Sequence, residues 1–368
     1  MQHLSESAGA VFAVLAASGD ATRPRLAQLA GLSKPTVSSA VAELETAGLA
    51  ARTGTTHGAT GRAAAVYRLG PAAGTVLAVD LGSTHTAVRA CTLDGTVVAS
   101  HTARDQGHAA DTVRAVLWGL AREAAGPVRG VVVAVPDVVR PGIRPATPAV
   151  AAAVDALALP SHLPVHIENN VNCAALAELH EGAAKGRHTF GYLQVGYGIG
   201  LGIVVGGEVL RGVGGAAGEI ARLPYPWLPE REAVLEGMEA YVGAGALMRR
   251  VREGWPDAGA PEGAAELFAL AGGGHAAARG FVAAHAREVG RLAAATVAVL
   301  DPGLIVLGGG IGANPQLLPG VRAELARLSW PTEVVGSEIG EEATVAGAAR
   351  LAVARGIQTV TEGSDKKH

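Results

Sequence analysis

The chain has 368 residues, of which 49% are hydrophobic and 17% charged; this composition can fill a large core in two or three domains and argues against disorder. Only two cysteines are present, Cys91 and Cys173, which excludes a disulfide framework and favours a reducing compartment. No apolar run is long enough to cross a membrane and the first residues lack a signal-peptide pattern, so we expect a cytoplasmic protein.

Charge is distributed unevenly along the chain. The formal net charge is −3, but residues 1–70 carry six basic and four acidic groups, which leaves −5 on the remainder. A mildly basic segment joined to an acidic body is typical of a small nucleic-acid-binding head. The difference in charge is small, so this hypothesis depends on the residue pattern of the head itself.

The first seventy residues predict a winged helix-turn-helix domain. Apolar residues at helical spacing mark helices around residues 11–15 and 26–30, and a third helix that begins after the N-capping residue Ser33. Gly31 supplies the turn before the third helix. Residues 49–69 contain two short strand-like runs around a loop rich in Gly and Thr, which predicts a wing hairpin.

The third helix carries short polar and basic side chains at its N-terminal end, which is the end that enters the major groove in this motif. Arg62 lies near the tip of the expected wing, where an arginine can enter a narrow minor groove. We therefore predict that the head binds double-stranded operator DNA, the alternative being a helical protein-interaction module. The candidate DNA-binding residues are Lys34, Thr36, Ser38, Ser39 and Arg62.

Strands alternate with helices from residue 75 onwards, which predicts a mostly parallel α/β body after a linker at residues 70–74. Hairpin patterns at residues 75–103 and 190–220 suggest two similar lobes. Glycine-rich turns follow several strands; glycine lets a backbone approach a phosphate, and Asp can hold a nucleotide-bound metal. A plain hairpin is the alternative for the first of these turns. The candidate nucleotide-like loops contain Asp80, Gly82, Thr84, Gly198, Gly200 and Gly309.

Together these segments resemble the ROK family of repressors and sugar kinases, within the actin/hexokinase superfamily. The resemblance rests on Asp80–Thr84, on residues 165–178 (VHIENNVNCAALAE), on Gly196–Gly202 through Glu219, and on Gly308–Gly310. Family members with a winged head resemble repressors of sugar-use genes, whereas the kinases usually lack that head. The resemblance implies a two-lobed α/β body. We expect four parts along the chain: 1–70, winged helix-turn-helix; 75–185, N-terminal lobe; 186–357, C-terminal lobe with its last helix returning to the first lobe; 358–368, disordered tail.

The chain departs from the family's kinases where their chemistry resides. In those kinases an aspartate, the general base that takes the proton of the sugar hydroxyl, stands at the position of Asn170; an amide cannot accept that proton at neutral pH. Tyr197 replaces a small hydroxyl residue, and Ala221-Arg222 replaces the Gly-His that closes the family signature. Residues 223–238 contain no Cys or His, so the family's structural zinc is not expected. We predict no catalytic residue, no metal and no cofactor.

Part of the sugar-facing set implied by the resemblance is retained. The sequence therefore predicts a transcriptional regulator, a repressor of sugar-related genes, that binds a sugar or sugar derivative and acts as a homodimer or homotetramer without contact to a membrane. The alternatives are an ATP-dependent sugar kinase with a regulatory head, or a scaffold without a ligand, in which the retained groups only cap helices or bind water. The candidate effector-binding residues are Asn169, Asn170, Glu219, Arg222 and Glu239.

Overall fold

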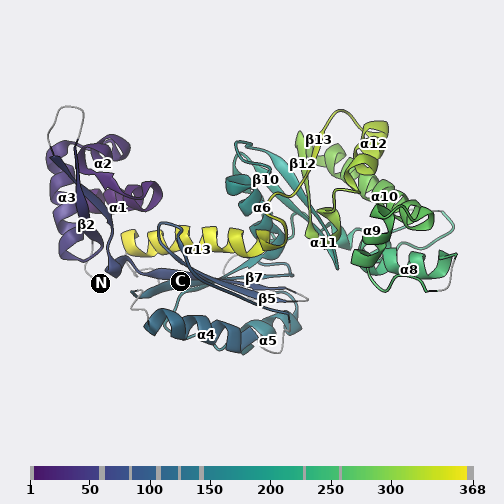
Figure 1. Ribbon diagram of the computed structural model, residues 1–368, viewed down its shortest axis with the longest axis horizontal. Coiled ribbons are helices and arrows are strands. Elements are labelled where there is room, and N and C mark those ends of the chain that lie inside the picture. Colours follow the sequence, from purple (N-terminus) through teal and green to yellow (C-terminus); the bar gives the residue numbers. More distant parts are fainter. Residues whose placement is uncertain are drawn as a thin grey trace. The chain divides into compact units, whose positions relative to one another are not determined.

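The computed structural model consists of two compact units, which are described separately (Figure 1). Unit 1 comprises residues 1–135, 148–168 and 348–368, and unit 2 comprises residues 136–147 and 169–347. The structure describes residues 4–57, 63–82, 85–104, 109–122, 126–140, 145–226, 229–256 and 259–362.

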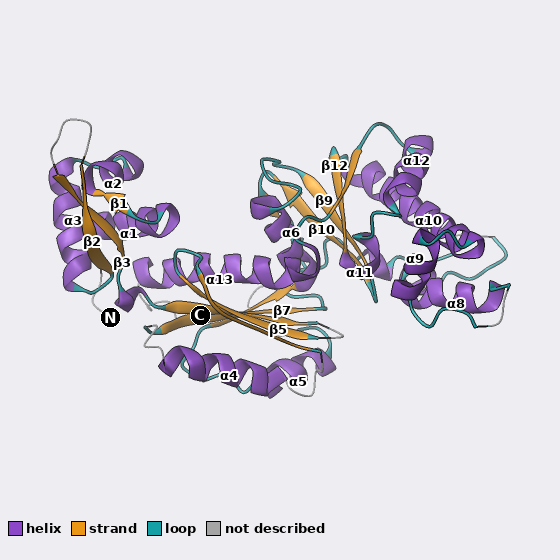
Figure 2. Ribbon diagram, viewed as in Figure 1, coloured by secondary structure: helices purple, strands orange, loops and turns teal. Residues whose placement is uncertain are grey.

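The N-terminal part of unit 1 is a winged helix-turn-helix, as the sequence predicts. Its three strands form an antiparallel sheet in the order β1-β3-β2 beside three helices (Figure 2). The elements are α1 (Glu6–Ser18), β1 (Ala21–Thr22), α2 (Arg23–Ala30), α3 (Lys34–Thr46), β2 (Ala50–His57) and β3 (Ala63–Leu69).

The helices of the head pack around an apolar core and are tied together at their ends. Ser5 caps α1 by accepting a hydrogen bond from the Ala8 amide, and its own amide donates to Glu43 of α3 at 2.8 Å. Gly31 ends α2 in the left-handed conformation that glycine adopts without strain. The fully buried side chains of this core include Val11, Phe12, Leu15, Leu26, Val37 and Leu44.

The remainder of unit 1 is a five-stranded mixed sheet in the order β6-β5-β4-β7-β8, with α4 and α5 on one face and α13 on the other (Figure 2). The central strand β4 runs antiparallel to β5 and parallel to β7. Gly356 of α13 allows this helix to lie against the sheet, because a Cβ there would meet Leu93 and Val76 at 2.6 Å. The elements are the 3₁₀ turn η1 (Pro71–Ala73), β4 (Thr75–Leu81), β5 (Thr86–Thr92), β6 (Val97–Ala103), α4 (Ala109–Arg122), β7 (Val128–Val135), α5 (Pro148–Ala156), β8 (Val165–Asn169) and α13 (Ala343–Glu362).

Unit 2 repeats this plan with a sheet in the order β11-β10-β9-β12-β13, in which β9 is antiparallel to β10 and parallel to β12. The two sheets thus share one topology, which confirms the expectation of two similar lobes. The elements are α6 (Asn170–Glu181), β9 (Phe190–Val195), β10 (Ile199–Val205), β11 (Glu208–Val209), η3 (Ile220–Arg222), α7 (Gly237–Val242), α8 (Ala244–Gly254), α9 (Ala264–Gly272), α10 (Ala276–Leu300), β12 (Leu304–Gly308), α11 (Gly309–Gly312), α12 (Leu318–Leu328), β13 (Glu333–Gly336) and η4 (Gly340–Glu342).

The boundaries of the parts differ from the expected ones. Residues 136–147, expected in the N-terminal lobe, belong to unit 2. Asn169 and the residues after it belong to unit 2, so the division lies before α6 rather than after residue 185. Residues 358–362, expected in a disordered tail, form the last turn of α13, and residues 363–368 lie outside the described part. The Cys91 and Cys173 side chains are both buried. Among the helices that the structure describes, none is long and apolar enough to cross a membrane.

Candidate functional site

The outward face of α3 is built by the same residues that start the helix. Ser33 is the N-cap: its Oγ accepts from the Thr36 amide at 3.3 Å and lies 2.7 Å from the Thr36 Oγ1. Lys34, Ser38 and Ser39 are exposed, whereas Thr36 is half-buried and engaged in the cap. The helix therefore presents one cation, two hydroxyls and its positive N-terminal dipole to solvent. Arg62 lies outside the described residues.

The first nucleotide-like turn, after β4, holds a buried carboxylate that faces a histidine. Asp80 is 3% exposed, and its Oδ2 lies 3.1 Å from Nε2 of His85. Gly82 makes room for this ring, because a Cβ there would lie 3.0 Å from His85 Cε1. The sequence did not single out His85, because only the folded structure shows its contact with Asp80. Thr84, the hydroxyl expected in the same turn, lies outside the described residues.

Two glycine-rich turns of unit 2 approach each other closely. A Cβ at Gly196, before β10, would lie 3.4 Å from the Gly310 amide nitrogen, and one at Gly309 would lie 2.6 Å from the Val195 carbonyl oxygen. Gly309 also has φ +81°, a conformation that favours glycine. The candidate loops around Gly198 and Gly309 are therefore brought together. Gly200 has a packing role, since its Cβ would meet the Val171 side chain of α6 at 2.8 Å.

Two carboxylates of unit 2 act on a third, that of Glu219. Burial raises the pKa of Glu219 above its ordinary value; Arg222 opposes this, while Asp137 and Glu239 raise the pKa further. The Glu239 carboxylate accepts a hydrogen bond from the Ile199 amide at 3.2 Å, next to Gly198. Three of the predicted effector-binding residues, Glu219, Arg222 and Glu239, thus lie within one electrostatic cluster.

Asp137 is a member of this cluster that the sequence analysis missed. It follows the buried strand 128–135 directly after Pro136, and this position at the end of a buried strand is the signal that could have revealed it. Its carboxylate is 9% exposed and accepts from the amides of Val138 at 2.8 Å and Thr147 at 2.7 Å. These bonds hold the carboxylate in place.

Asn169 joins the cluster to α6. Its Oδ1 caps the helix by accepting from the amides of Val171 at 2.8 Å and Asn172 at 3.1 Å, and its Nδ2 donates to the Asp137 carbonyl oxygen at 3.1 Å. The helix-capping role left open for the retained polar groups therefore applies to Asn169. Asn170, the first residue of α6, is half-buried.

The cluster contains hydrogen-bonding groups that suit a polyol. Carboxylates and amides accept and donate the hydrogen bonds that sugar hydroxyls form. No group of three or more His, Cys, Asp or Glu side chains that could hold a metal ion occurs among the residues that the structure describes.

Comparison with known proteins gives two family matches. The model of the ROK family matches residues 76–355, and the model of the MarR family matches residues 4–63. The bifunctional enzyme NanE/NanK of Brucella melitensis is 31% identical over 191 residues, covering 51% of this chain and 35% of the enzyme. A glucokinase of Streptomyces coelicolor is 31% identical over 219 residues, covering 52% of this chain and 67% of the enzyme. The matched region therefore spans about a third of the length of the first of these relatives.

Solved structures share the fold. A ROK hexokinase from Thermus thermophilus is 34% identical with a TM-score of 0.59, over 76% of this chain and 97% of that one. A ROK family transcriptional regulator, a homolog of the E. coli MLC protein, has a TM-score of 0.72 at 22% identity, over 97% of this chain and 98% of that one. The likeness to the regulator extends over the winged head as well as the body, and at this identity it shows a shared fold. The chain belongs to the ROK family and carries an N-terminal winged helix-turn-helix of the MarR type.

Proposed function

We propose that this protein is a DNA-binding transcriptional repressor of sugar-related genes, whose kinase-like body binds a sugar or sugar derivative without phosphorylating it. The observation that carries the proposal is the arrangement of α3. Val37, Val41 and Leu44 fix the helix in the head, while Lys34, Ser38 and Ser39 face solvent at its N-terminal end. In a winged helix-turn-helix this end meets the base edges of the major groove.

Two features of the body support a loss of phosphoryl transfer. Asn170 offers no proton acceptor to a sugar hydroxyl, and general-base assistance contributes about 10²- to 10⁴-fold to such reactions. The carboxylate of Asp80, which in a nucleotide site would face a metal ion, instead lies against the His85 ring. Binding of a sugar needs neither group, because Glu219 and Glu239 supply acceptors in unit 2.

The proposed regulator works through two conformations of unequal affinity for the operator. A sugar that binds one conformation more tightly increases the population of that conformation. The sugar therefore changes the affinity for operator DNA, and the operator changes the affinity for the sugar by the same factor. We expect a homodimer or homotetramer, since paired heads match a palindromic operator.

Capture of fragments of the host genome by the purified full-length protein tests the proposal. We expect enrichment of a few promoter fragments that share an inverted repeat, followed by release or tighter binding when the cognate sugar is added. Retention of no promoter fragment at physiological salt would contradict the proposal.

A second function, an ATP-dependent sugar kinase with a regulatory head, is favoured by one observation: the glycine turns around Gly196 and Gly309 still meet in unit 2. A coupled phosphorylation assay with common hexoses separates the two functions. We expect no turnover by the wild type. Gain of turnover in Asn170→Asp would show that the missing base is the main deficit, whereas wild-type turnover would establish the kinase.

A further inference from the structure

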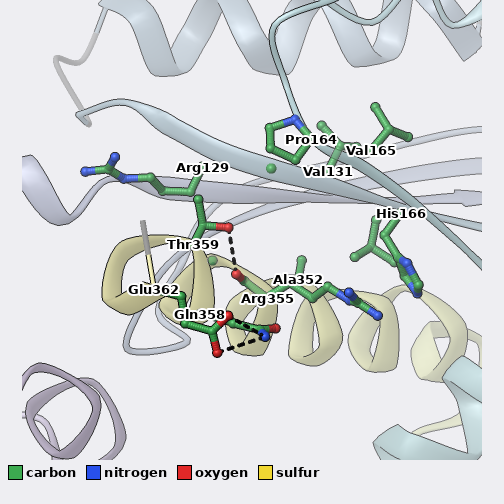
Figure 3. A pocket seen from close by; sticks show the side chains of 13 residues that line it. Arg129, Val131, Pro164, Val165, His166, Ala352, Arg355, Gln358, Thr359 and Glu362 are labelled. Atoms are coloured by element: carbon green, nitrogen blue, oxygen red, sulfur yellow. Dashed lines mark hydrogen bonds between the residues drawn. The ribbon is translucent and has the colours of Figure 1, made fainter. Parts of the chain in front are cut away.

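Unit 1 contains a pocket of about 320 Å³ outside the candidate sites already described (Figure 3). It lies between the C-terminal half of α13 and the strands β7 and β8, and its floor is apolar, with Val131, Pro164 and Val165 among the lining residues. This volume falls at the lower end of the range of small-molecule sites and suits a ligand of monosaccharide size. Its polar lining residues are Arg129, His166, Arg355, Gln358, Thr359 and Glu362.

The polar lining is predominantly cationic. Arg129 and Arg355 carry permanent charges. In Figure 3 the His166 ring and the Arg355 guanidinium lie toward one end of the pocket and the Arg129 guanidinium toward the other. His166 Nε2 lies 4.0 Å from Oε2 of Glu168. Glu362 is the one acidic residue that lines the pocket. Its carboxylate accepts a hydrogen bond from the side-chain amide of Gln358 at 3.0 Å. Guanidinium groups bind carboxylate and phosphate oxygens in pairs.

Two elements that line the pocket also contact the head or the turn that follows it. Arg129 Nε donates to the Ala73 carbonyl at 2.9 Å and its Nη2 donates to that of Ala72, both in the turn that joins head and body. The last turn of α13 touches α1, because a Cβ at Gly9 would lie 3.6 Å from the Thr361 Cβ. A ligand held by Arg355 that shifts α13 therefore acts on the contact between α13 and α1 of the head.

We propose that this pocket binds a small organic anion of monosaccharide size, through Arg355 and His166, and that its binding changes the affinity of the head for DNA. The phosphate of a sugar ester and the carboxylates of a small organic acid share the required chemistry. The binding site stands independently of the function proposed above, and only its effect on DNA rests on that function.

Calorimetric titration of the full-length protein tests the site without DNA, with glucose 6-phosphate, citrate and inorganic phosphate as probes. We expect saturable binding of glucose 6-phosphate or of citrate, and the difference between the two identifies the anionic group. Arg355→Gln should weaken this binding about tenfold or more, the usual effect of losing a charge-assisted hydrogen bond. Arg350→Gln, which changes an exposed arginine of the same helix that does not line the pocket, should bind as the wild type does.

Three results would overturn the site: no saturable binding of any probe, equal affinity in wild type and Arg355→Gln, or binding of inorganic phosphate alone. The effect on DNA is measured as operator affinity with and without the bound anion. We expect a change in the wild type that is lost in Arg355→Gln; an unchanged operator affinity would refute the coupling. A protein that binds the anion but no DNA refutes the function proposed above and leaves the site intact.

Discussion

The imidazole of His285 is held in an environment that disfavours its charged form. It lies in α10 with 1% exposure, and its Nδ1 is 3.4 Å from Nη2 of Arg250. Burial and the positive charge of Arg250 lower the pKa of His285 from 6.5 to about 4. The unfolded chain consequently binds a proton between these two values that the folded chain does not bind.

We expect the free energy of unfolding to fall as the pH drops from about 6.5 toward 4, because protonation of His285 favours the unfolded chain. The full effect is at most about 3 kcal/mol, and urea unfolding at a series of pH values measures it. His285→Gln should reduce the dependence on pH, whereas His162→Gln, at an exposed position, should keep it. An identical pH dependence in wild type and His285→Gln would refute this assignment.

Lys34→Ala should weaken binding to every operator sequence alike, by up to about tenfold, since a lysine at this position pairs with a phosphate rather than a base. The slope of log affinity against log salt concentration should fall by about one, as one fewer counterion is released. Gel-shift titrations at several salt concentrations measure both quantities. Lys185→Ala, at an exposed lysine of unit 2, serves as the control. An unaltered slope in Lys34→Ala would remove this residue from the interface.

Single residues were predictable where their role is local and unpredictable where it depends on a distant neighbour. The position of Ser33 before a run of helix-forming residues identified it as a cap, and the structure has this cap. Asn169 also caps a helix, but the hydrogen bond that its Nδ2 donates to the Asp137 carbonyl joins residues 32 positions apart. The roles of His85 and Asp137 likewise arise from contacts that no local pattern records.

The segment from Gly70 to Gly74 is the element whose sequence was most misleading. Its Pro and Gly residues predict a linker, but the structure contains a 3₁₀ turn with no room for a side chain at Gly70 or Gly74 on either side of it. A Cβ at Gly74 would lie 2.1 Å from the Pro127 carbonyl oxygen, and the Thr75 amide donates to the same oxygen at 2.9 Å. Glycine is needed here for close packing rather than for freedom of movement.

A matched pair of glycines tests this conclusion. Gly74 has φ +85° and Gly95 has φ +86°, but a Cβ at Gly95 would meet no atom within 4 Å. Gly95→Ala should cost only the backbone strain, about 1–2 kcal/mol, and Gly74→Ala should cost a further 1–3 kcal/mol, roughly, from the steric clash. Thermal unfolding measures both variants. Equal losses of stability would mean that the junction yields to an added methyl group.

Helices and strands with a regular apolar period were predicted well, because burial on one face imposes that period. The helices expected around residues 11–15 and 26–30 lie within α1 and α2. The disordered tail expected at 358–368 was wrong at its beginning, since Val360 is buried and α13 continues to Glu362. A Cβ at Gly356 of this helix would meet Leu93 and Val76, so the helix packs on strands that are distant in sequence, which the local sequence does not reveal.

At the scale of the whole molecule, the order of motifs predicted a head and two lobes, and the two sheets of equal topology bear this out. The position of the division between the units was not predictable. Residues 136–147 belong to unit 2 although residues before and after them belong to unit 1. Such crossings are set by contacts between segments distant in sequence.

We expect two chains to bind one palindromic operator fragment, because each head reads one half-site. Mass photometry of the complex on a fragment with both half-sites, and on one with a single half-site, measures the stoichiometry. The single half-site should bind much more weakly. One chain per full palindrome at saturation would exclude the dimer.

Both native thiols are buried, and this offers a route to the motions of the intact protein. A maleimide dye reacts slowly with a thiol that solvent does not reach. Two cysteines introduced at exposed positions, one in each unit, would therefore take up a donor and an acceptor fluorophore in the folded wild-type background. Energy transfer between the dyes would then report, in a single molecule, how the units rearrange when ligand or DNA arrives.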